Sequence, residues 1–435
     1  MGSTRDGVPL RRTRAVGIAL LAAVALAACG PPPANPPDWV GSRFPRTASA
    51  TEVVNRFGAW TDDQWFATVR SVTPIGGSGT TITLDVYPRQ GPGGSQLGAP
   101  QSLPLTADVG FGGPIGEHVI ALGGTAPYGE PTTVAFFRPV AGTWAPAGST
   151  TLPAGFQLSA MTDDWLVARR VPGDPSFSGD GQVLVLAVDT AGPLVSAAQV
   201  ATLGPDPSWP AALREGFGNA VALDGDLLAV GAVGQSAPTP GGVRVFRAGP
   251  GGWAPAQSLG GTVEPSTFGR TLAVDDGATV DRLVIGPQGT SVATLAVDVL
   301  VDAGSGFALE QRLDRDAGLP DASNGNYYAA SIAIDGPALA IAARTSTVPS
   351  ADPLHAPVTV GHVMTYRRYG TWVREAELDL FPTPFDAGVR TSLPARLQLS
   401  GSHLAASLFV TPDEPPGCVF PCFVFGFEAW SFDRI

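Results

Sequence analysis

Histidines and carboxylates are the side chains of this 435-residue chain best suited to acid–base or nucleophilic chemistry, and their spacing forms no catalytic pattern. The four histidines are His118, His355, His362 and His403, and no two have the H-x-x-x-H or H-E-x-x-H spacing of a zinc site. No G-x-S-x-G turn stands between a strand and a helix, as a hydrolase nucleophile would require. Scattered carboxylates could still meet as an acid–base pair. The sequence therefore names no catalytic residue and leaves a carbohydrate-active hydrolase or lyase as the alternative function.

The three cysteines occur in two different contexts. Cys418 and Cys422 are separated by three residues, a C-x-x-x-C spacing that differs from the C-x-x-C of thiol oxidoreductases. Export would favour a disulfide between them, and the chain-entropy model gives so short a loop only about 2 kcal/mol. Free thiols are the alternative. Cys29 ends the segment Leu26-Ala27-Ala28-Cys29, which resembles a bacterial lipobox and implies a diacylated cysteine as the first mature residue.

The N-terminal segment has the layout of an export signal. Arginines at 5, 11, 12 and 14 precede the apolar run Ala15–Ala28, whose 14 residues are too few to span a bilayer. We expect residues 1–28 to be a lipoprotein signal peptide and residues 29–41 a lipidated cysteine with a proline-rich tether. An ordinary signal peptide that contains a cysteine is the alternative.

The charge of the mature chain bears on its partners. Without residues 1–28 it has 22 arginines and 37 acidic residues, a net charge of −15. This balance argues against nucleic acid and against electrostatic attraction to anionic lipid. We therefore expect a monomer held at the bacterial envelope, on the extracytoplasmic side, by its N-terminal lipid.

The segment Arg214–Leu259 contains four strand-like runs. They are Asn219–Leu223, Leu227–Ala232, Gly242–Arg247 and Trp253–Leu259. The third run alternates apolar and polar residues, and the first two are nearly all apolar, as in strands buried on both faces. One four-stranded sheet cannot cover both of its faces, so the segment needs copies of itself beside it.

Copies are present along the chain with a period of about 55 residues, in the range of propeller blades. Trp144-Ala145-Pro146-Ala147 recurs 109 residues later as Trp253-Ala254-Pro255-Ala256. The repeats predict an all-β, seven-bladed propeller of four-stranded antiparallel blades over residues 42–435. Its blades are expected at 53–105, 106–155, 156–208, 209–261, 262–316, 317–380 and 381–435. The last repeat stops after a third strand, Phe423–Asp433, so we expect Arg43–Ala50 to close the ring as the outer strand of the last blade.

Gly216–Ala232 resembles an FG-GAP repeat, the unit of integrin alpha-chain propellers and of many bacterial surface proteins. Phe57-Gly58, Phe111-Gly112 and Phe268-Gly269 repeat the first half of the motif. The resemblance implies a propeller used for adhesion or ligand binding. Blades of this family often carry a D-x-D-x-D-G-x-x-D calcium loop. Here only Asp275, Asp276 and Asp281 gather on a longer turn, and Leu272 and Val274 occupy the earlier ligand positions, so we expect no cofactor and no metal, with calcium at these three aspartates as the alternative.

Long loops offer the remaining place for function. In a propeller, the connections between second and third strands and between blades gather on one face, here called the loop face. Its aromatic and histidine candidates for a ligand surface are Tyr128, Phe177, Trp209, Tyr327, Tyr328 and His355. The alternative is that these rings fill gaps between blades. The sequence thus favours a non-enzymatic binding or adhesion scaffold for a protein or a glycan.

Overall fold

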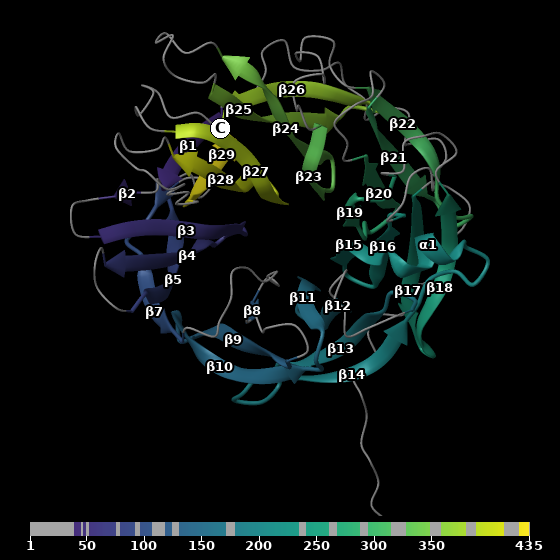
Figure 1. Ribbon diagram of the computed structural model, residues 1–435, viewed down its shortest axis with the longest axis horizontal. Helices are drawn as coiled ribbons and strands as arrows, with labels where there is room; N and C mark the ends of the chain where they lie inside the picture. Colours follow the sequence, from purple (N-terminus) through teal and green to yellow (C-terminus); the bar gives the residue numbers. More distant parts are fainter. Residues whose placement is uncertain are drawn as a thin grey trace, which may run out of the picture.

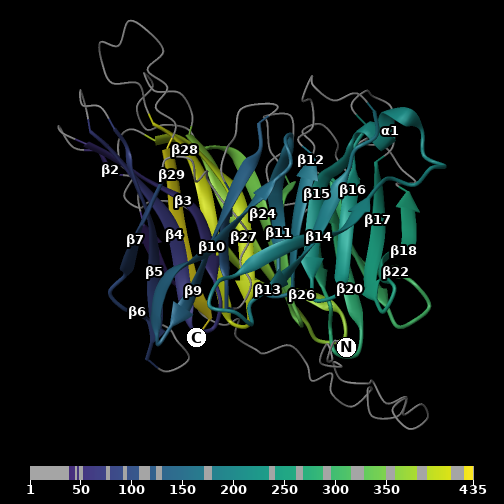
Figure 2. The ribbon, with the colours of Figure 1, turned by 90° about the horizontal axis from the view of Figure 1, so that it is seen from below.

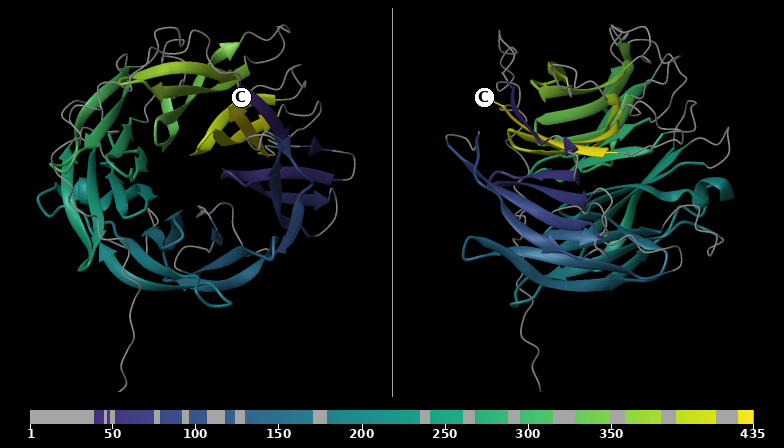
Figure 3. Two further views of the ribbon diagram at one scale, coloured as in Figure 1. Left: turned by 180° about the vertical axis from the view of Figure 1, so that it is seen from behind. Right: turned by 60° about the vertical axis from the view of Figure 1, so that its left-hand side comes forward.

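Seven blades of antiparallel strands surround a central channel (Figure 1). The structure is a computed structural model, and it describes residues 39–44, 47–48, 52–74, 79–91, 96–106, 118–123, 130–170, 179–234, 241–260, 268–287, 295–314, 328–348, 358–379, 389–412 and 426–434. The strands run along the channel axis (Figure 2). Seen from behind, the inner strands again encircle the channel (Figure 3). The predicted propeller is confirmed.

The strands of each blade lie within its predicted range, except that β3 begins one residue early at Glu52 and the closing strand of the seventh blade lies elsewhere. The first blade contains β3 (Glu52–Thr61), β4 (Trp65–Pro74), β5 (Thr81–Gln90) and β7 (Gln101–Leu105), with β6 (Gln96–Leu97) beside β5. The described part of the second contains β8 (Ile120–Gly123), β9 (Thr132–Val140) and β10 (Thr143–Leu152). The third contains β11 (Phe156–Met161), β12 (Trp165–Arg170), β13 (Val183–Asp189) and β14 (Ser196–Leu203).

The remaining blades repeat this order. A short helix, α1 (Ala211–Glu215), precedes the fourth blade, which contains β15 (Phe217–Asp224), β16 (Leu227–Ala232), β17 (Gly242–Gly249) and β18 (Gly252–Gly260). The fifth contains β19 (Thr271–Asp275), β20 (Asp281–Gly286), β21 (Ala296–Asp302) and β22 (Ala308–Asp314). The sixth contains β23 (Tyr328–Asp335), β24 (Ala338–Val348), β25 (Val358–Arg368) and β26 (Trp372–Asp379). The seventh contains β27 (Val389–Ser400), β28 (His403–Pro412), β29 (Gly426–Arg434) and β1 (Trp39–Phe44).

The ring closes through an N-terminal strand, as predicted, but at a different place in the sequence. β1 pairs antiparallel with β29, from Trp39 opposite Arg434 to Phe44 opposite Ala429. The predicted strand Arg43–Ala50 shares only Arg43 and Phe44 with β1. Pro45 has no amide hydrogen and cannot continue a ladder, so pairing with β29 ends at Phe44. Beyond it, β2 (Thr47–Ala48) pairs with β3 in the first blade.

The repeated Phe-Gly pair is a bulge in the inner strand. The ladder shifts register after Phe57 in the first blade and after Phe217 in the fourth. The glycines that follow, Gly58 and Gly218, have φ of +64° and +94°, a conformation that costs a glycine little. In the sixth blade Ala329 takes the same conformation, with φ +57°. The motif therefore marks a β-bulge, which bends the inner strand.

The inner strand β15 differs from the sequence interpretation. We expected the first two strands of the fourth blade to be buried on both faces. β16 is fully buried, whereas most residues of β15 are half-buried. The physical reason is that β15 lies at the edge of its sheet and lines the channel.

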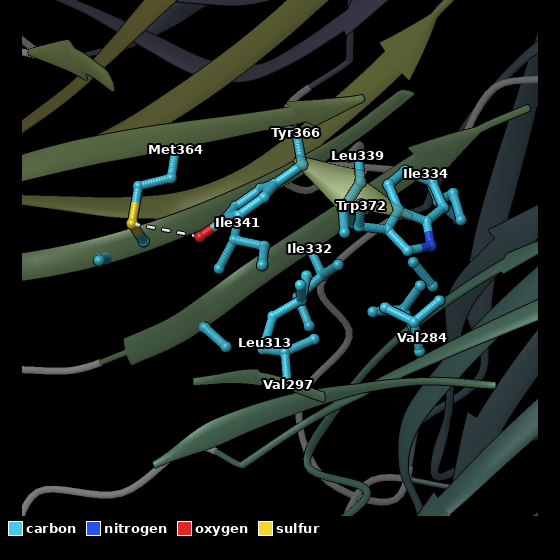
Figure 4. Close-up of a cluster of buried hydrophobic side chains, with 14 of the residues drawn as sticks. Val284, Val297, Leu313, Ile332, Ile334, Leu339, Ile341, Met364, Tyr366 and Trp372 are labelled. Atoms are coloured by element: carbon cyan, nitrogen blue, oxygen red, sulfur yellow. Dashed lines mark hydrogen bonds between the residues drawn. The ribbon is translucent and has the colours of Figure 1, made fainter. Parts of the chain in front are cut away.

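Apolar side chains fill the spaces between neighbouring blades. Figure 4 shows the cluster between the fifth and sixth blades, where Val284, Val297 and Leu313 pack against Ile332, Leu339, Ile341 and Trp372. The Tyr366 hydroxyl approaches the Met364 sulfur at 3.9 Å beside this cluster. Since each blade buries its faces against its neighbours, the stability of any blade depends on those beside it.

Glutamines of the outer strands clasp the next blade. Gln257 of β18 accepts a hydrogen bond from the Phe307 amide at 2.7 Å and donates one to the Phe307 carbonyl at 3.2 Å. Gln101 binds Trp144 in this way, and Gln311 binds Trp372. The side-chain amide thus pairs with a backbone residue as a neighbouring strand would, and so links two sheets.

A buried ionic cluster joins the first and seventh blades, and we call it the ring-closing seam (Arg89, Asp433 and His403). Arg89 of β5 is 0% exposed, and its Nη1 donates to Asp433 Oδ1 at 2.5 Å. His403 Nδ1 lies 2.7 Å from the same oxygen. Arg89 also donates to Thr61 Oγ1 and to the Asp62 carbonyl. The seam therefore satisfies a buried guanidinium where the two ends of the chain meet.

Candidate functional site

The central channel forms a cavity among the described residues. It has a volume of about 680 Å³ and is lined by the inner strands β3, β11, β15, β19, β23 and β27. This volume lies within the range of roughly 300–1,000 Å³ that small-molecule sites occupy. Each of these strands except β3 and β27 ends its sheet, and unpaired backbone groups of edge strands can bind ligands. The channel is therefore the candidate site of the described structure.

Five aspartates stand at one end of the channel, where the inner strands turn back. This aspartate rim consists of Asp62, Asp163, Asp164, Asp224 and Asp335. The chain turns here because polar segments separate two apolar runs: Thr-Asp-Asp in the first and third blades, and Asp-Gly in the fourth and sixth. The rim gives this end of the channel a concentrated negative charge.

Hydrogen bonds between blades hold the rim turns together. Asp224 of the fourth blade accepts a bond from the Asp276 amide of the fifth at 2.7 Å, and Asp276 accepts one from the Asp226 amide at 2.9 Å. Asp335 of the sixth blade accepts a bond from the Gly401 amide of the seventh. A carboxylate on one turn thus satisfies a backbone amide on the next.

The same arrangement occurs elsewhere around the ring. Asp275 accepts a bond from the Gly336 amide at 3.1 Å, linking the fifth and sixth blades. Asp163 of the third blade accepts one from the His118 amide at 3.0 Å and lies 2.8 Å from His118 Nδ1. These contacts assign several of the aspartates a part in assembling the ring.

Burial changes the acidity of the rim. It raises the pKa of Asp62 to about 6, although the Gln64 and Trp65 amides, which donate to this carboxylate, oppose the shift. Burial also raises the pKa of Asp224 to about 6, although the bond from the Asp276 amide opposes the shift. Part of the rim therefore gains protons near pH 6, well above the usual range of an aspartate.

The candidate calcium aspartates point to different partners. Asp275 binds the Gly336 amide and lies 3.6 Å from Arg282, while Asp281 forms a 2.6 Å ion pair with Arg247. Asp276 binds the Asp226 amide. Within the described ranges, no group of three histidine, cysteine or acidic side chains is arranged to hold a metal ion. Two arginines beside the turn also oppose a cation there.

Two of the predicted loop-face residues are described. Trp209 is half-buried in the cluster of the third and fourth blades, and its ring would lie 3.0 Å from a Cβ placed on Gly242. This position favours a gap-filling role for Trp209. Tyr328 begins β23, opposite Ala343. The predicted site residues that lie outside the described part of the chain are Tyr128, Phe177, Tyr327, His355, Cys29, Cys418 and Cys422.

The structure adds a channel residue that the sequence analysis did not single out. Arg396 lies on β27 and lines the channel. Burial lowers the pKa of its guanidinium. The available signal was an arginine within the otherwise apolar run Leu393–Leu397.

No protein-family model matches the sequence, and a search of curated proteins finds no match. The solved structures that resemble the chain include an acylaminoacyl peptidase from Pyrococcus horikoshii (TM-score 0.46, 10% identity), with coverage of 82% of this chain and 51% of the peptidase. They also include the β-propeller domain of the Trilobed protease from Pyrococcus furiosus (TM-score 0.45, 8% identity), with coverage of 82% and 95%. A glycoside hydrolase has a TM-score of 0.30 and 9% identity, with coverage of 63% and 86%.

The chain spans about half the length of the acylaminoacyl peptidase, and identities this low carry no information on activity. Among the described residues, no helix has the length and apolar character needed to cross a bilayer.

Proposed function

We propose that the protein is a lipid-anchored component of the bacterial envelope whose propeller is a non-enzymatic scaffold that binds a protein or a glycan. The observation that supports this function most directly is the bonding of the aspartates at the channel. Asp163, Asp224 and Asp335 each accept a backbone amide of a neighbouring blade. Carboxylates that hold the ring together are poorly placed to approach a substrate as nucleophile or base.

The loop face is the proposed binding surface. The antiparallel order of each blade puts the second-to-third-strand connections and the connections between blades at the end opposite the aspartate rim. Loops on a rigid scaffold are the usual place for binding residues. The FG-GAP resemblance, carried by Gly216–Ala232, points to the same use.

The anchor is proposed at Cys29. The spacer Gly30–Asp38 separates this cysteine from β1, which begins at Trp39. A proline-rich segment of this length reaches about 28 Å when extended. The seventh blade would therefore stand within this distance of the membrane.

The test uses the full chain, extracted from the envelope and applied to a glycan array and to cross-linking with envelope proteins. We expect ligands that are retained intact, with equal binding by wild type and by a Cys29→Ser variant. Mass spectrometry of the array would detect turnover. Shortened glycans or peptides that accumulate with time would contradict a non-enzymatic scaffold.

A carbohydrate-active enzyme is the second candidate, and the raised pKa of Asp62 and Asp224 favours it. A carboxyl group with a pKa near 6 is suited to general acid catalysis. If the protein is an enzyme, Asp62→Asn or Asp224→Asn should lower turnover by about 10²–10⁴-fold. If it is a scaffold, both variants should bind the array as wild type does.

A further inference from the structure

We infer that the central channel is a second binding site, for a small hydroxylated monocarboxylic acid whose carboxylate is held by Arg396. This site lies apart from the loop face and goes beyond the scaffold function proposed above.

Arg396 is a half-buried cation that has no partner among the described residues. Within the residues that the structure describes, its guanidinium has no hydrogen-bond acceptor and no carboxylate within ion-pair distance. Arginines elsewhere in the blades have protein partners: Arg89 pairs with Asp433 at 2.5 Å, and Arg169 donates to the Asn219 carbonyl at 2.6 Å. The guanidinium of Arg396 lines the channel with its donors unused, so a ligand carboxylate in the channel can accept two hydrogen bonds from it.

The strand that carries Arg396 is fixed on both sides. The Leu397 amide donates to Ser331 Oγ of the sixth blade at 2.9 Å. Gln398 Oε1 accepts a bond from the Thr61 amide of the first blade at 3.3 Å. A guanidinium on so firmly held a backbone loses less freedom when it binds a ligand.

The channel around Arg396 suits hydroxyl groups. Ser159, Thr271 and Ser331 line it from three other blades. Ser331 uses its oxygen as an acceptor for Leu397, which leaves its hydroxyl hydrogen to donate. These hydroxyls can bind several oxygens of one ligand. Further hydrogen-bonding groups are the backbone groups at the free edges of β11, β15, β19 and β23.

Charge selects a single carboxylate over a multiply charged anion. A guanidinium binds a carboxylate or a phosphate with two parallel hydrogen bonds. The aspartate rim and the net charge of −12 repel a dianion more strongly than a monoanion. A sugar acid has one negative charge, several hydroxyl groups and a size that the 680 Å³ channel can hold.

The test is isothermal titration of the full chain with glucuronate. Glucose serves as the uncharged counterpart and inorganic phosphate as the other anion. We expect glucuronate to bind and glucose not to bind. Arg396→Gln should weaken glucuronate binding by about tenfold or more, and Arg396→Lys should retain part of it. The matched control is Arg270→Gln, because Arg270 is an exposed arginine outside the channel lining and its loss should leave binding unchanged.

A second measurement separates a ligand role from a structural one. Because Arg396 has no partner among the described residues, Arg396→Gln should melt no lower than wild type in the absence of ligand. A lower melting temperature would mean that the guanidinium stabilises the fold, and would overturn the inference. It would also be overturned if glucuronate failed to bind, if it bound no better than glucose or phosphate, or if Arg396→Gln bound it as wild type does.

Discussion

Asp433→Asn should open the propeller at the ring-closing seam. The substitution keeps the shape of the side chain and removes the charge that faces Arg89, which is 0% exposed. It also removes the charge beside His403. The buried guanidinium keeps its neutral acceptors, Thr61 Oγ1 and the Asp62 carbonyl, but loses its ion pair.

The expected loss is large for one substitution. Removing one partner of a buried ion pair costs about 3–5 kcal/mol. With an unfolding entropy of about 2 cal/mol/K per residue, a propeller of this size should melt roughly 4–6 °C lower. The first and seventh blades should separate first, because the seam joins β5 of the first blade to β29 of the seventh, and β1, which pairs with β29, leads directly into the first blade.

Thermal melts of wild type and Asp433→Asn measure the loss, and hydrogen exchange at β1 measures the opening. Arg89→Met combined with Asp433→Leu should recover part of the stability, since it removes both buried charges. The control is Arg312→Ala, which breaks an ion pair with Asp298 whose arginine is 52% exposed, and should cost at most about 1 kcal/mol. A melting temperature within 1 °C of wild type for Asp433→Asn, or a double variant as unstable as the single one, would refute this account of the seam.

Three further predictions concern backbone contact, acidity and anchoring. Gly241→Ala should destabilise the fold by about 3 kcal/mol or more, because its Cβ would lie 1.9 Å from the Phe268 carbonyl oxygen of the next blade; Gly251→Ala, which meets nothing within 4 Å, should be near neutral in the same urea titration. Asp224→Asn should equal wild type in stability at pH 4 and exceed it by about 1–3 kcal/mol at pH 7.5. The Asp224 carboxyl has a pKa of about 6 in the native state and 3.8 in the unfolded state. It therefore favours the native state below pH 4, and this contribution is lost as the pH rises through 6. Equal melting temperatures of the two proteins at both pH values would contradict this prediction. Cys29→Ser should move the protein from the membrane to the soluble fraction and abolish palmitate labelling, and unchanged fractionation would exclude Cys29 as the anchor.

The fold was predictable because its main signals are local. A turn such as Asp224-Gly225-Asp226 between two apolar runs specifies a hairpin within one blade, and the repeats show how often the unit recurs. The position of the closing strand could not be predicted in the same way. The choice between Trp39–Phe44 and Arg43–Ala50 depends on β29, a partner almost four hundred residues away. Pro45 was the one local signal that could have placed it.

The channel was harder to predict than the blades. The sequence marks Asp224 and Asp335 as turn residues, but only the closed ring brings each carboxylate to an amide of the next blade. The contacts of Asp224 and Asp335 join residues 52 and 66 positions apart, and no local pattern in the sequence marks such a pair. Arg396 is distinguished by having no partner among the described residues, and that can be seen only once its surroundings in the channel are known.

The pairing of β1 with β29 also sets an order of events in the cell. Trp39 and Arg434 lie opposite each other in one sheet, so the first strand cannot pair until nearly the whole propeller has been synthesised. During that interval β3 and the inner blades can form, while β1 remains an open edge able to pair with another chain. Loss of the nine residues of β29 by proteolysis or premature termination would release β1 as well. The ordering of β1 therefore depends on the presence of β29.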